Sequence, residues 1–303
     1  MQTLRLCYIA VALMCAAFAS ASENTNNAEQ ASAQPSTTIV LKKEGTPLAQ
    51  YRYIDVPFKP YVDELRTPTG RNILRDAPWD HLHHHGLMFA LQVGDCHFWP
   101  EWNDNCGKQI TTQIRAEADS LETKLDWNDP QRTLATEVRK INVGQGDNFT
   151  FLDWQSTLTA VVDTMLGEDN PGVGYYYGLG MRFDETMDKE GRFFNDTGKH
   201  DGQITNNDER LKHCRWMAYT AKLEGKPVTV AVFDHPSNPV PMLAFTMGET
   251  GTPFAYMSAT MNLHRKPVEL KAGQSFSTKY RVALWEGEVS PETVEKAYAG
   301  FVR

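Results

Sequence analysis

Short runs of alternating apolar and polar residues dominate the chain from about residue 37 onward. The clearest run is "FTFLDWQSTLTAVV" (149–162), where Leu152, Trp154, Leu158, Ala160 and Val162 alternate with Asp153, Gln155, Thr157 and Thr159. Alternation with a period of two predicts a strand with one buried face, in an antiparallel sheet whose other face meets solvent or a ligand. The preceding segment "VGQGDN" (143–148) predicts a hairpin connection.

More than a dozen such runs predict strands, among them "GLMFALQV" (86–93), "GYYYGLGMRF" (174–183) and "PVTVAVFD" (227–234). One helix is expected at the C-terminal end of the sequence. A cap, a first-turn proline and apolar residues at helical spacing coincide there: Ser290, Pro291, Val294, Ala297, Tyr298 and Phe301. The pattern predicts a mainly β fold, an antiparallel β-sandwich or super-sandwich with one C-terminal helix.

The first residues have the pattern of an export signal. Arg5 precedes the apolar run "LCYIAVALMCAAFA", and small residues at 19–21 form a cleavage site. Residues 22–36 are polar and without periodicity, which is typical of disorder. We therefore predict a signal peptide over 1–21, a disordered linker over 22–36 and a single β-sandwich domain over 37–303. The protein is expected to be exported, to the periplasm or the extracellular space.

Charge limits the classes of partner. The chain has a formal net charge of −8, and removal of Arg5 leaves 29 basic against 38 acidic residues, a net charge of −9. This balance, without any basic run, argues against nucleic acid and anionic membranes as partners. No apolar stretch after the signal is long enough to predict a membrane span.

Three cysteines lie beyond the signal. Cys96 and Cys106 flank a turn-like segment, and an oxidising compartment would permit a disulfide between them. The alternative of free thiols stays open at this point. If Cys96 and Cys106 pair, Cys214 is expected to be a leftover buried thiol.

The segment "DAPWDHLHHHGLMFALQV" (76–93) holds four histidines within five positions. If the segment is a strand, His81, His83 and His85 point to one side and His84 to the other. Imidazoles at i and i+2 can bind one metal ion, and the third ligand would come from a set of three candidates: Glu101, His97 or His235. Imidazole also titrates near neutrality, so that the same residues could be acid–base catalysts. A structural role, capping the end of a sheet, is the third alternative.

The segment "CHFWPEW" (96–102) places Phe98, Trp99 and Trp102 around Glu101. Aromatic rings beside a carboxylate are a common lining of sugar sites, because the apolar face of a pyranose stacks on a ring. Burial against these rings would raise the pKa of Glu101 and make it a usable acid. The alternative is a core hairpin with Glu101 exposed.

Two further segments carry candidate binding residues. In "VFDHPSNPVP" (232–241), Asp234 is expected to orient His235, or else to make only the hydrogen bonds of a turn. In "GLGMRF" (178–183), Arg182 follows two glycines and suits a ligand carboxylate or sugar hydroxyls. A structural ion pair of Arg182 with Asp153 or Glu137 is the alternative.

Other segments exclude or limit functions. The sequence has neither a phosphate-binding GxxxxGK[ST] loop nor a GxSxG nucleophile elbow. Residues 184–212 form a long polar insertion, which is expected to be either a lid over a site or a mobile segment.

Taken in order, these segments resemble a known family. The series "TPTG … DAPWDHLHHHGL … FWPEW … GLGMRF … VAVFDHPSNP … LKAGQSF … YRVALWEG" is similar to the bacterial family catalogued as "methane oxygenase PmoA", over residues 50–288. The final segment "VELKAGQSFSTKYRVALWEG" (268–287) also resembles the last strands of galactose-mutarotase-like domains. The second resemblance implies a super-sandwich that binds carbohydrate on its concave face.

The family pattern selects a set of site residues in this chain: His81, His83, His84, Glu101, Arg182, Asp234, His235 and Asn238. This chain departs from the family pattern at two places, which weakens the assignment of these site residues. The family commonly has arginine where this chain has His85, so His85 is the least expected functional member of the cluster. It also has tryptophan and arginine where this chain reads "PMLAFTMG" (241–248), which puts the substrate preference in doubt.

The leading hypothesis is an exported carbohydrate-active enzyme that works by acid–base chemistry, as an epimerase, lyase or hydrolase. The expected catalytic residues are His81, His83, His84, Glu101 and His235. The expected substrate-binding residues are Trp99, Arg182, Asp234 and Asn238. Whether a divalent metal binds at His81 and His83 stays open. The alternatives are a non-catalytic glycan-binding protein and, as the family name implies, a metal-dependent oxygenase.

Overall fold

The computed structural model describes residues 37–168, 172, 174–198, 202–248 and 254–303. The expected signal peptide and linker, residues 1–36, lie outside this range. Residues Ser36–Arg303 form one structural unit. No helix in the described part of the chain has the length and apolar character needed to cross a membrane.

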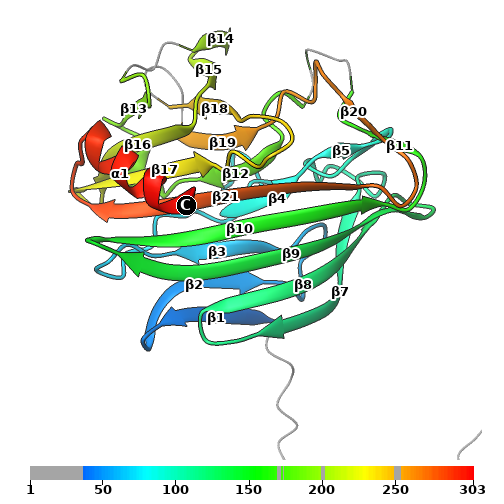
Figure 1. Ribbon diagram of the computed structural model, residues 1–303, viewed down its shortest axis with the longest axis horizontal. Coiled ribbons are helices and arrows are strands. Elements are labelled where there is room, and N and C mark those ends of the chain that lie inside the picture. Colours follow the sequence, from blue (N-terminus) through cyan, green and yellow to red (C-terminus); the bar gives the residue numbers. More distant parts are fainter. Residues whose placement is uncertain (1–36, 169–171, 173, 199–201, 249–253) are drawn as a thin grey trace, which may run out of the picture. The chain divides into compact units, whose positions relative to one another are not determined.

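Three antiparallel sheets make up this unit (Figure 1). The largest has nine strands, in the spatial order β1 (Thr38–Lys43), β2 (Thr46–Arg52), β3 (Tyr61–Leu65), β4 (Leu87–Ala90), β12 (Gly178–Arg182), β19 (Tyr256–Thr260), β18 (Leu243–Met247), β15 (Glu209–His213) and β14 (Gln203–Asn206). This sheet carries the residues of the candidate site.

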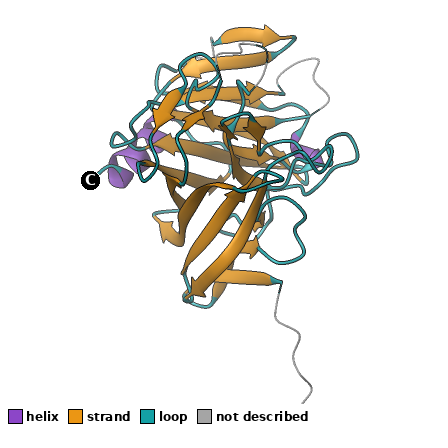
Figure 2. Ribbon diagram, turned by 90° about the vertical axis from the view of Figure 1, so that its right-hand side faces the viewer, coloured by secondary structure: helices purple, strands orange, loops and turns teal. Residues whose placement is uncertain are grey.

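The second sheet has eight strands and includes the longest ones. Its order is β13 (Arg192–Asn195), β16 (Trp216–Leu223), β17 (Lys226–Asp234), β21 (Ser275–Glu286), β10 (Phe149–Ala160), β9 (Thr133–Gly146), β8 (Ser120–Asn128) and β7 (Lys108–Ala116). A third sheet of four short strands comprises β20 (Val268–Leu270), β11 (Thr164–Leu166), β5 (Gln92–Val93) and β6 (Cys96–His97). The stacked strands of the two large sheets are visible in Figure 2.

One apolar core fills the space between the two large sheets. In β10, every second side chain is buried, among them Leu152, Trp154 and Leu158, which belong to the same apolar cluster as Leu179 and Met257 of the facing sheet. The alternation thus marks the core face, as expected for a half-buried strand. The predicted antiparallel β-sandwich is confirmed, as is the hairpin between β9 and β10.

The predicted C-terminal helix is confirmed as α1 (Pro291–Phe301). The Ser290 side chain accepts a hydrogen bond from the Thr293 amide, and Pro291 occupies the first turn. The buried face of α1 packs on β16, β17 and β21, with Trp216, Phe233 and Trp285 against it. The helix therefore covers the face of the eight-stranded sheet that points away from the main core.

The polar insertion at 184–212 has regular structure in its described part. It contains a 3₁₀ turn, η1 (Glu185–Met187), the strand β13 in one sheet, and the hairpin β14–β15 at the edge of the other. The prediction of a mobile segment is wrong for these strands, because β15 pairs along its length with β18. Residues 199–201 lie outside the described range.

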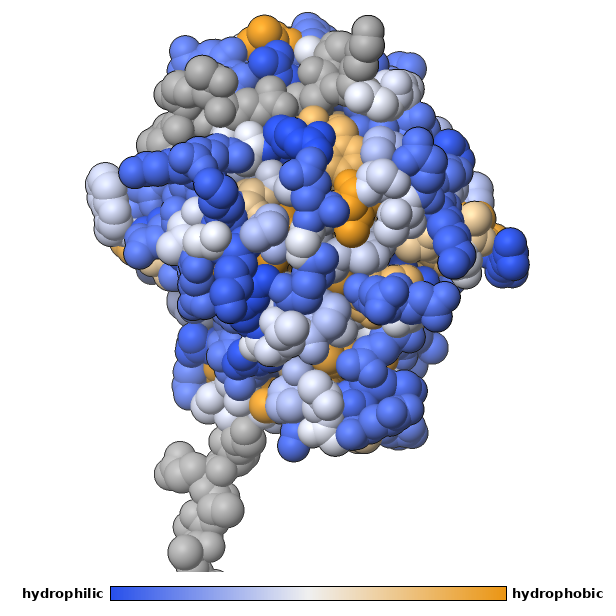
Figure 3. Space-filling view, turned by 90° about the vertical axis from the view of Figure 1, so that its left-hand side faces the viewer, coloured by the Kyte–Doolittle hydropathy of each residue, from blue (hydrophilic) through white to orange (hydrophobic). Residues whose placement is uncertain are grey.

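Cysteine and surface chemistry complete the description. Cys96, Cys106 and Cys214 are free thiols, the first two buried, so that the alternative of a Cys96–Cys106 disulfide does not hold in this structure. Figure 3 shows a face that is mostly hydrophilic with only small apolar patches, in keeping with the many acidic residues of the chain.

Candidate functional site

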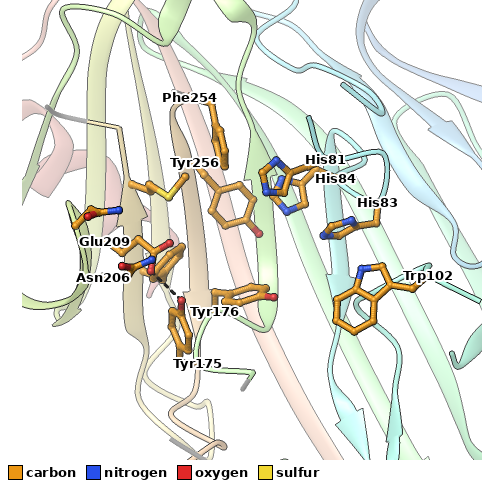
Figure 4. A pocket seen from close by; sticks show the side chains of 13 residues that line it. His81, His83, His84, Trp102, Tyr175, Tyr176, Asn206, Glu209, Phe254 and Tyr256 are labelled. Atoms are coloured by element: carbon orange, nitrogen blue, oxygen red, sulfur yellow. Dashed lines mark hydrogen bonds between the residues drawn. The ribbon is translucent and has the colours of Figure 1, made fainter. Parts of the chain in front are cut away.

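A pocket of about 440 Å³ opens over the β12–β19–β18 part of the nine-stranded sheet (Figure 4). This volume lies within the roughly 300–1,000 Å³ that is usual for small-molecule sites. Aromatic, imidazole and amide side chains dominate the lining, which consists of His81, His83, His84, Trp102, Tyr175, Tyr176, Asn206, Asn207, Glu209, Phe245, Met247, Phe254 and Tyr256.

The sheet builds the floor of the pocket through its register. Arg182, Tyr256 and Met247 are paired across β12, β19 and β18 and therefore share a face. Gly180 lies on the same face, two residues before Arg182. A Cβ at position 180 would lie 1.8 Å from Oη of Tyr256, so the glycine makes room for the tyrosine ring. One of the two glycines that precede Arg182 thus makes room for a side chain of the neighbouring strand.

The histidine segment is a turn and not a strand. The His84 amide donates to the His81 carbonyl at 2.9 Å, and Ala77 and Gly86 have positive φ angles on either side. Because the backbone is not extended, the predicted alternation is wrong: His81, His83 and His84 line the pocket, and His85 points elsewhere.

The three pocket histidines contact one another closely. The ring centroids of His81 and His84 are 4.6 Å apart and stacked, and those of His83 and His84 are 4.7 Å apart. Burial lowers the pKa of His83 to about 4, and burial and the neighbouring histidines lower the pKa of His84 well below its ordinary value. At neutral pH, His83 and His84 are therefore uncharged and able to accept hydrogen bonds.

The opposite wall comes from the hairpin β14–β15 and the segment before β12. Asn206 and Glu209 are paired in the hairpin register, and the Tyr175 hydroxyl donates to Glu209 Oε2 at 2.8 Å. Tyr176 lies at the base of this wall, between the hairpin and the histidines (Figure 4). The pocket therefore has an imidazole side and a carboxylate–amide side, with aromatic rings between them.

Glu101 and His85 belong to a buried charge series behind the histidine turn. The Lys59 ammonium donates to Glu101, Glu101 lies 3.1 Å from Nε2 of His85, and Nδ1 of His85 lies 2.7 Å from Asp76. Asp76 also accepts from the Tyr61 hydroxyl at 2.8 Å. The series connects the turn and the Trp102 segment to strand β3, and none of its members lines the pocket.

The pKa of Glu101 differs from the prediction. Burial by itself would raise it, but the hydrogen bond with His85 and the charge of Lys59 outweigh burial, and the pKa is lowered. The expected carboxylic acid is therefore a carboxylate held by Lys59 and His85. For His85 the two effects have the opposite signs. Burial by itself would lower the pKa of His85, but the hydrogen bonds with Asp76 and Glu101 outweigh burial, and this pKa is raised.

Arg182 is fully buried beneath the pocket. Its guanidinium donates to Asp80 at 2.8 Å and lies 3.6 Å from the ring centroid of Phe254, which separates it from the pocket. The proposed ion pair with Asp153 or Glu137 is wrong, because Asp153 holds Arg281 and Glu137 holds Arg139. Arg182 thus supports Asp80 and Phe254 from beneath the pocket.

The "DHP" loop lies at the end of β17, in the other sheet. Asp234 accepts from the Asn238 side chain and from the Met242 amide, whereas His235 contacts Ser237 and the ring of Phe301. The prediction that Asp234 orients His235 is therefore wrong, and the alternative of turn hydrogen bonds describes the loop. None of Asp234, His235 and Asn238 lines the pocket.

The aromatic segment divides between core and pocket. Trp99 is fully buried and stacks on Tyr177 with centroids 5.5 Å apart, while Phe98 packs on Trp127. Trp102 is 73% exposed and lines the pocket beside His83. Trp99 therefore supports the pocket from behind, and Trp102 supplies the accessible ring.

Several lining residues were missed by the sequence interpretation. They are Tyr175, Tyr176, Asn206, Asn207, Glu209, Phe245, Met247, Phe254 and Tyr256. The "YYY" run at 175–177 was a usable signal, since three consecutive tyrosines cannot all face the core of one strand. The hairpin residues gave no comparable signal, because a polar insertion has the same composition whether or not it contacts a ligand.

Metal binding finds no support in the described residues. No three His, Cys, Asp or Glu side chains in that part of the chain converge in an arrangement that could hold a metal ion. Of the candidate third ligands, Glu101 faces His85, His97 lies 3.2 Å from the Tyr177 hydroxyl, and His235 is on the other sheet. The donor set at His81 and His83 therefore does not fit a metal centre.

Comparison with known proteins identifies a family and distant structural neighbours. The model of a family of unknown function, DUF6807, matches residues 38–299. No curated protein matches the sequence. The matching family has no assigned function, and its description does not mention methane oxygenase.

The solved structures similar to this chain are sugar-related enzymes at low similarity. An α-galactosidase from Lactobacillus brevis has 6% identity and a TM-score of 0.48, over 82% of this chain and 39% of that one. A candidate aldose 1-epimerase from Escherichia coli K12 has 8% identity and a TM-score of 0.46, over 82% and 99%. A galactose mutarotase related enzyme from Lactobacillus acidophilus has 8% identity and a TM-score of 0.42, over 83% and 100%. At this level, the similarities say nothing of what this chain binds or does.

Proposed function

The chain belongs to the DUF6807 family, and since that family has no assigned function, we propose one from the pocket itself: acid–base chemistry on a carbohydrate. The observation that carries the proposal is the pair of uncharged, closely packed imidazoles, His83 and His84, on one wall of an aromatic pocket. Neutral imidazole accepts protons, and general acid–base catalysis needs such a group within reach of the substrate.

The lining suits a polyhydroxylated ring. Trp102 and Tyr176 offer aromatic faces on which the C–H groups of a sugar ring can stack. Asn206, Glu209 and the imidazoles offer hydrogen-bonding groups around them. An apolar lining with a few convergent polar groups is the usual composition of a specific small-molecule site.

Tyr256 supports the imidazole wall from the floor of the pocket, and its hydroxyl oxygen is buried. Burial raises the pKa of Tyr256 well above its ordinary value, so its hydroxyl stays protonated at neutral pH. The rings of Tyr256 and His84 have centroids 5.2 Å apart. Tyr256 therefore stays a neutral phenol that packs beside His84, and the proposal assigns proton transfer to the imidazoles that line the pocket.

The test is a search for proton transfer and product formation. The protein would be incubated in D₂O with neutral, amino and acidic sugars and their oligosaccharides, with mass spectrometry and NMR as readouts. We expect product or carbon-bound deuterium with at least one sugar, and a loss of about 10²- to 10⁴-fold in rate in His83→Ala. His213→Ala, which alters an exposed imidazole outside this pocket, is the matched control.

Two results would contradict the proposal. Full activity of His83→Ala would remove the imidazole from the mechanism. Saturable sugar binding without product or exchange would instead favour a non-catalytic glycan-binding protein. A metal-dependent oxygenase has no supporting observation, because the described residues present no metal-binding arrangement.

A further inference from the structure

One carboxylate carries the acidic character of the pocket lining. Among the described residues that line the pocket, Glu209 is the only carboxylate, and none is lysine or arginine. Glu209 lies on β15, on the wall opposite the histidines (Figure 4). The proposed acid–base chemistry makes no use of this carboxylate.

Glu209 is held with one oxygen engaged. The hydroxyl of Tyr175 donates to Oε2 at 2.8 Å, and the hydroxyl of Thr205 lies 3.4 Å from the same atom. No side chain in the described part of the structure donates to Oε1. Asn206, the register partner of Glu209, places an amide beside the carboxylate. The wall therefore presents acceptor atoms in a fixed position.

The cations near the pocket are already paired. Arg182 donates to Asp80 at 2.8 Å, and Arg210 donates to Asp208 at 2.8 Å. Lys59, fully buried behind the histidine turn, is bound to Glu101. Each of these three groups thus already has a carboxylate partner that offsets its positive charge.

Two of the three imidazoles on the facing wall supply no positive charge either. Burial lowers the pKa of His83 and His84, and both rings are uncharged at neutral pH. A ligand carboxylate or phosphate would lose its hydration in the pocket and meet the negative charge of Glu209. Like charges brought together without a counter-ion cost several kcal/mol.

We propose that Glu209 determines the charge specificity of the pocket: it accepts hydrogen bonds from the hydroxyl or ammonium groups of neutral and amino sugars and excludes uronates and sugar phosphates. This inference rests on the proposed function, since it assumes that the ligand is a sugar. Selection against a competitor by an uncompensated charge is a common source of specificity. The hairpin β14–β15 is thereby the specificity-determining element.

The test compares sugars that differ in charge. Hexoses, hexosamines and hexuronates of the gluco, galacto and manno series would be titrated against the wild type and Glu209→Gln by calorimetry. We expect the wild type to bind a neutral or amino sugar at least about tenfold more tightly than the matching uronate. In Glu209→Gln, which keeps the side-chain size, this preference should fall below about threefold. Glu117→Gln, an exposed substitution outside the pocket, should leave it unchanged.

The outcomes separate this inference from the function on which it rests. Equal binding of neutral and acidic sugars by the wild type, or an unchanged preference in Glu209→Gln, overturns the role of Glu209 alone. Deuterium exchange or product formation would persist in that case. The absence of binding by every sugar overturns the proposed function and the inference together.

Discussion

At the scale of single residues, Gly180 sets the shape of the pocket floor. A Cβ at this position would lie 1.8 Å from Oη of Tyr256 and 2.6 Å from the ring of Trp99, both buried. The Trp99 ring is held by stacking on Tyr177, with ring centroids 5.5 Å apart. An added methyl group must therefore displace the hydroxyl end of Tyr256.

We expect Gly180→Ala to lower the free energy of unfolding by about 1–3 kcal/mol, as is typical of overpacked cores, and to weaken ligand binding. Urea denaturation and calorimetry measure the two effects. Gly300→Ala in α1 is the control, since nothing lies within 4 Å of its Cβ and alanine favours a helix over glycine. Unchanged stability and binding in Gly180→Ala would show that Tyr256 is not confined as described.

The same scale shows what residue types can and cannot predict. The sequence identified His81, His83 and His84 as a group with chemistry, and the structure places all three at one pocket. It could not predict the direction of each ring, because direction depends on a turn that is fixed by contacts outside the segment. Nor could the sequence identify Glu209 as a pocket residue. Its position depends on the pairing of β15 with β18, which lies more than thirty residues further along the chain.

At the scale of elements, two loops are anchored by one charge series. His85 closes the histidine turn and Glu101 precedes Trp102, and the two side chains meet 3.1 Å apart over the buried Lys59. The Glu101 carboxylate thus anchors both the histidine turn and the segment that carries Trp102. Removing its charge should loosen both loops and leave the ammonium without a counter-ion.

We expect Glu101→Gln to lower the free energy of unfolding by about 3–5 kcal/mol, because breaking a buried pair leaves an uncompensated charge. Urea denaturation would measure this change. Glu122→Gln removes one partner of the exposed pair with Lys140 and should change stability little. A Glu101→Gln protein as stable as the Glu122→Gln protein would contradict the anchoring role.

Elements also differ in how far the sequence predicts them. The helix α1 and the strands with clear alternation, such as β10, follow from local patterns because each buries one regular face. The hairpin β14–β15 lies at the edge of the nine-stranded sheet, and most of its side chains are partly or fully exposed. Its sequence therefore lacks an apolar pattern. Its strands are specified by pairing with the rest of the sheet and not by their own composition.

At the scale of the whole molecule, buried histidines make the stability depend on pH. Burial lowers the pKa of His83, His84, His97 and His264, which means that the unfolded chain binds protons more readily at these positions. As the pH falls below about 6.5, the unfolded state gains protons that the folded state excludes, and stability decreases. His85, whose pKa is raised, contributes in the opposite direction.

His264 allows this dependence to be measured apart from the pocket. Its side chain is 3% exposed, neither ring nitrogen has a hydrogen-bond partner among the described residues, and burial lowers its pKa to about 4. Between about pH 6.5 and pH 4, this residue should therefore reduce the free energy of unfolding by up to about 1.4 kcal/mol for each pH unit. We expect His264→Gln to lose stability more slowly than the wild type in urea denaturation at pH 7, 6, 5 and 4.5. Parallel curves for the two proteins would mean that His264 takes up a proton in the folded state.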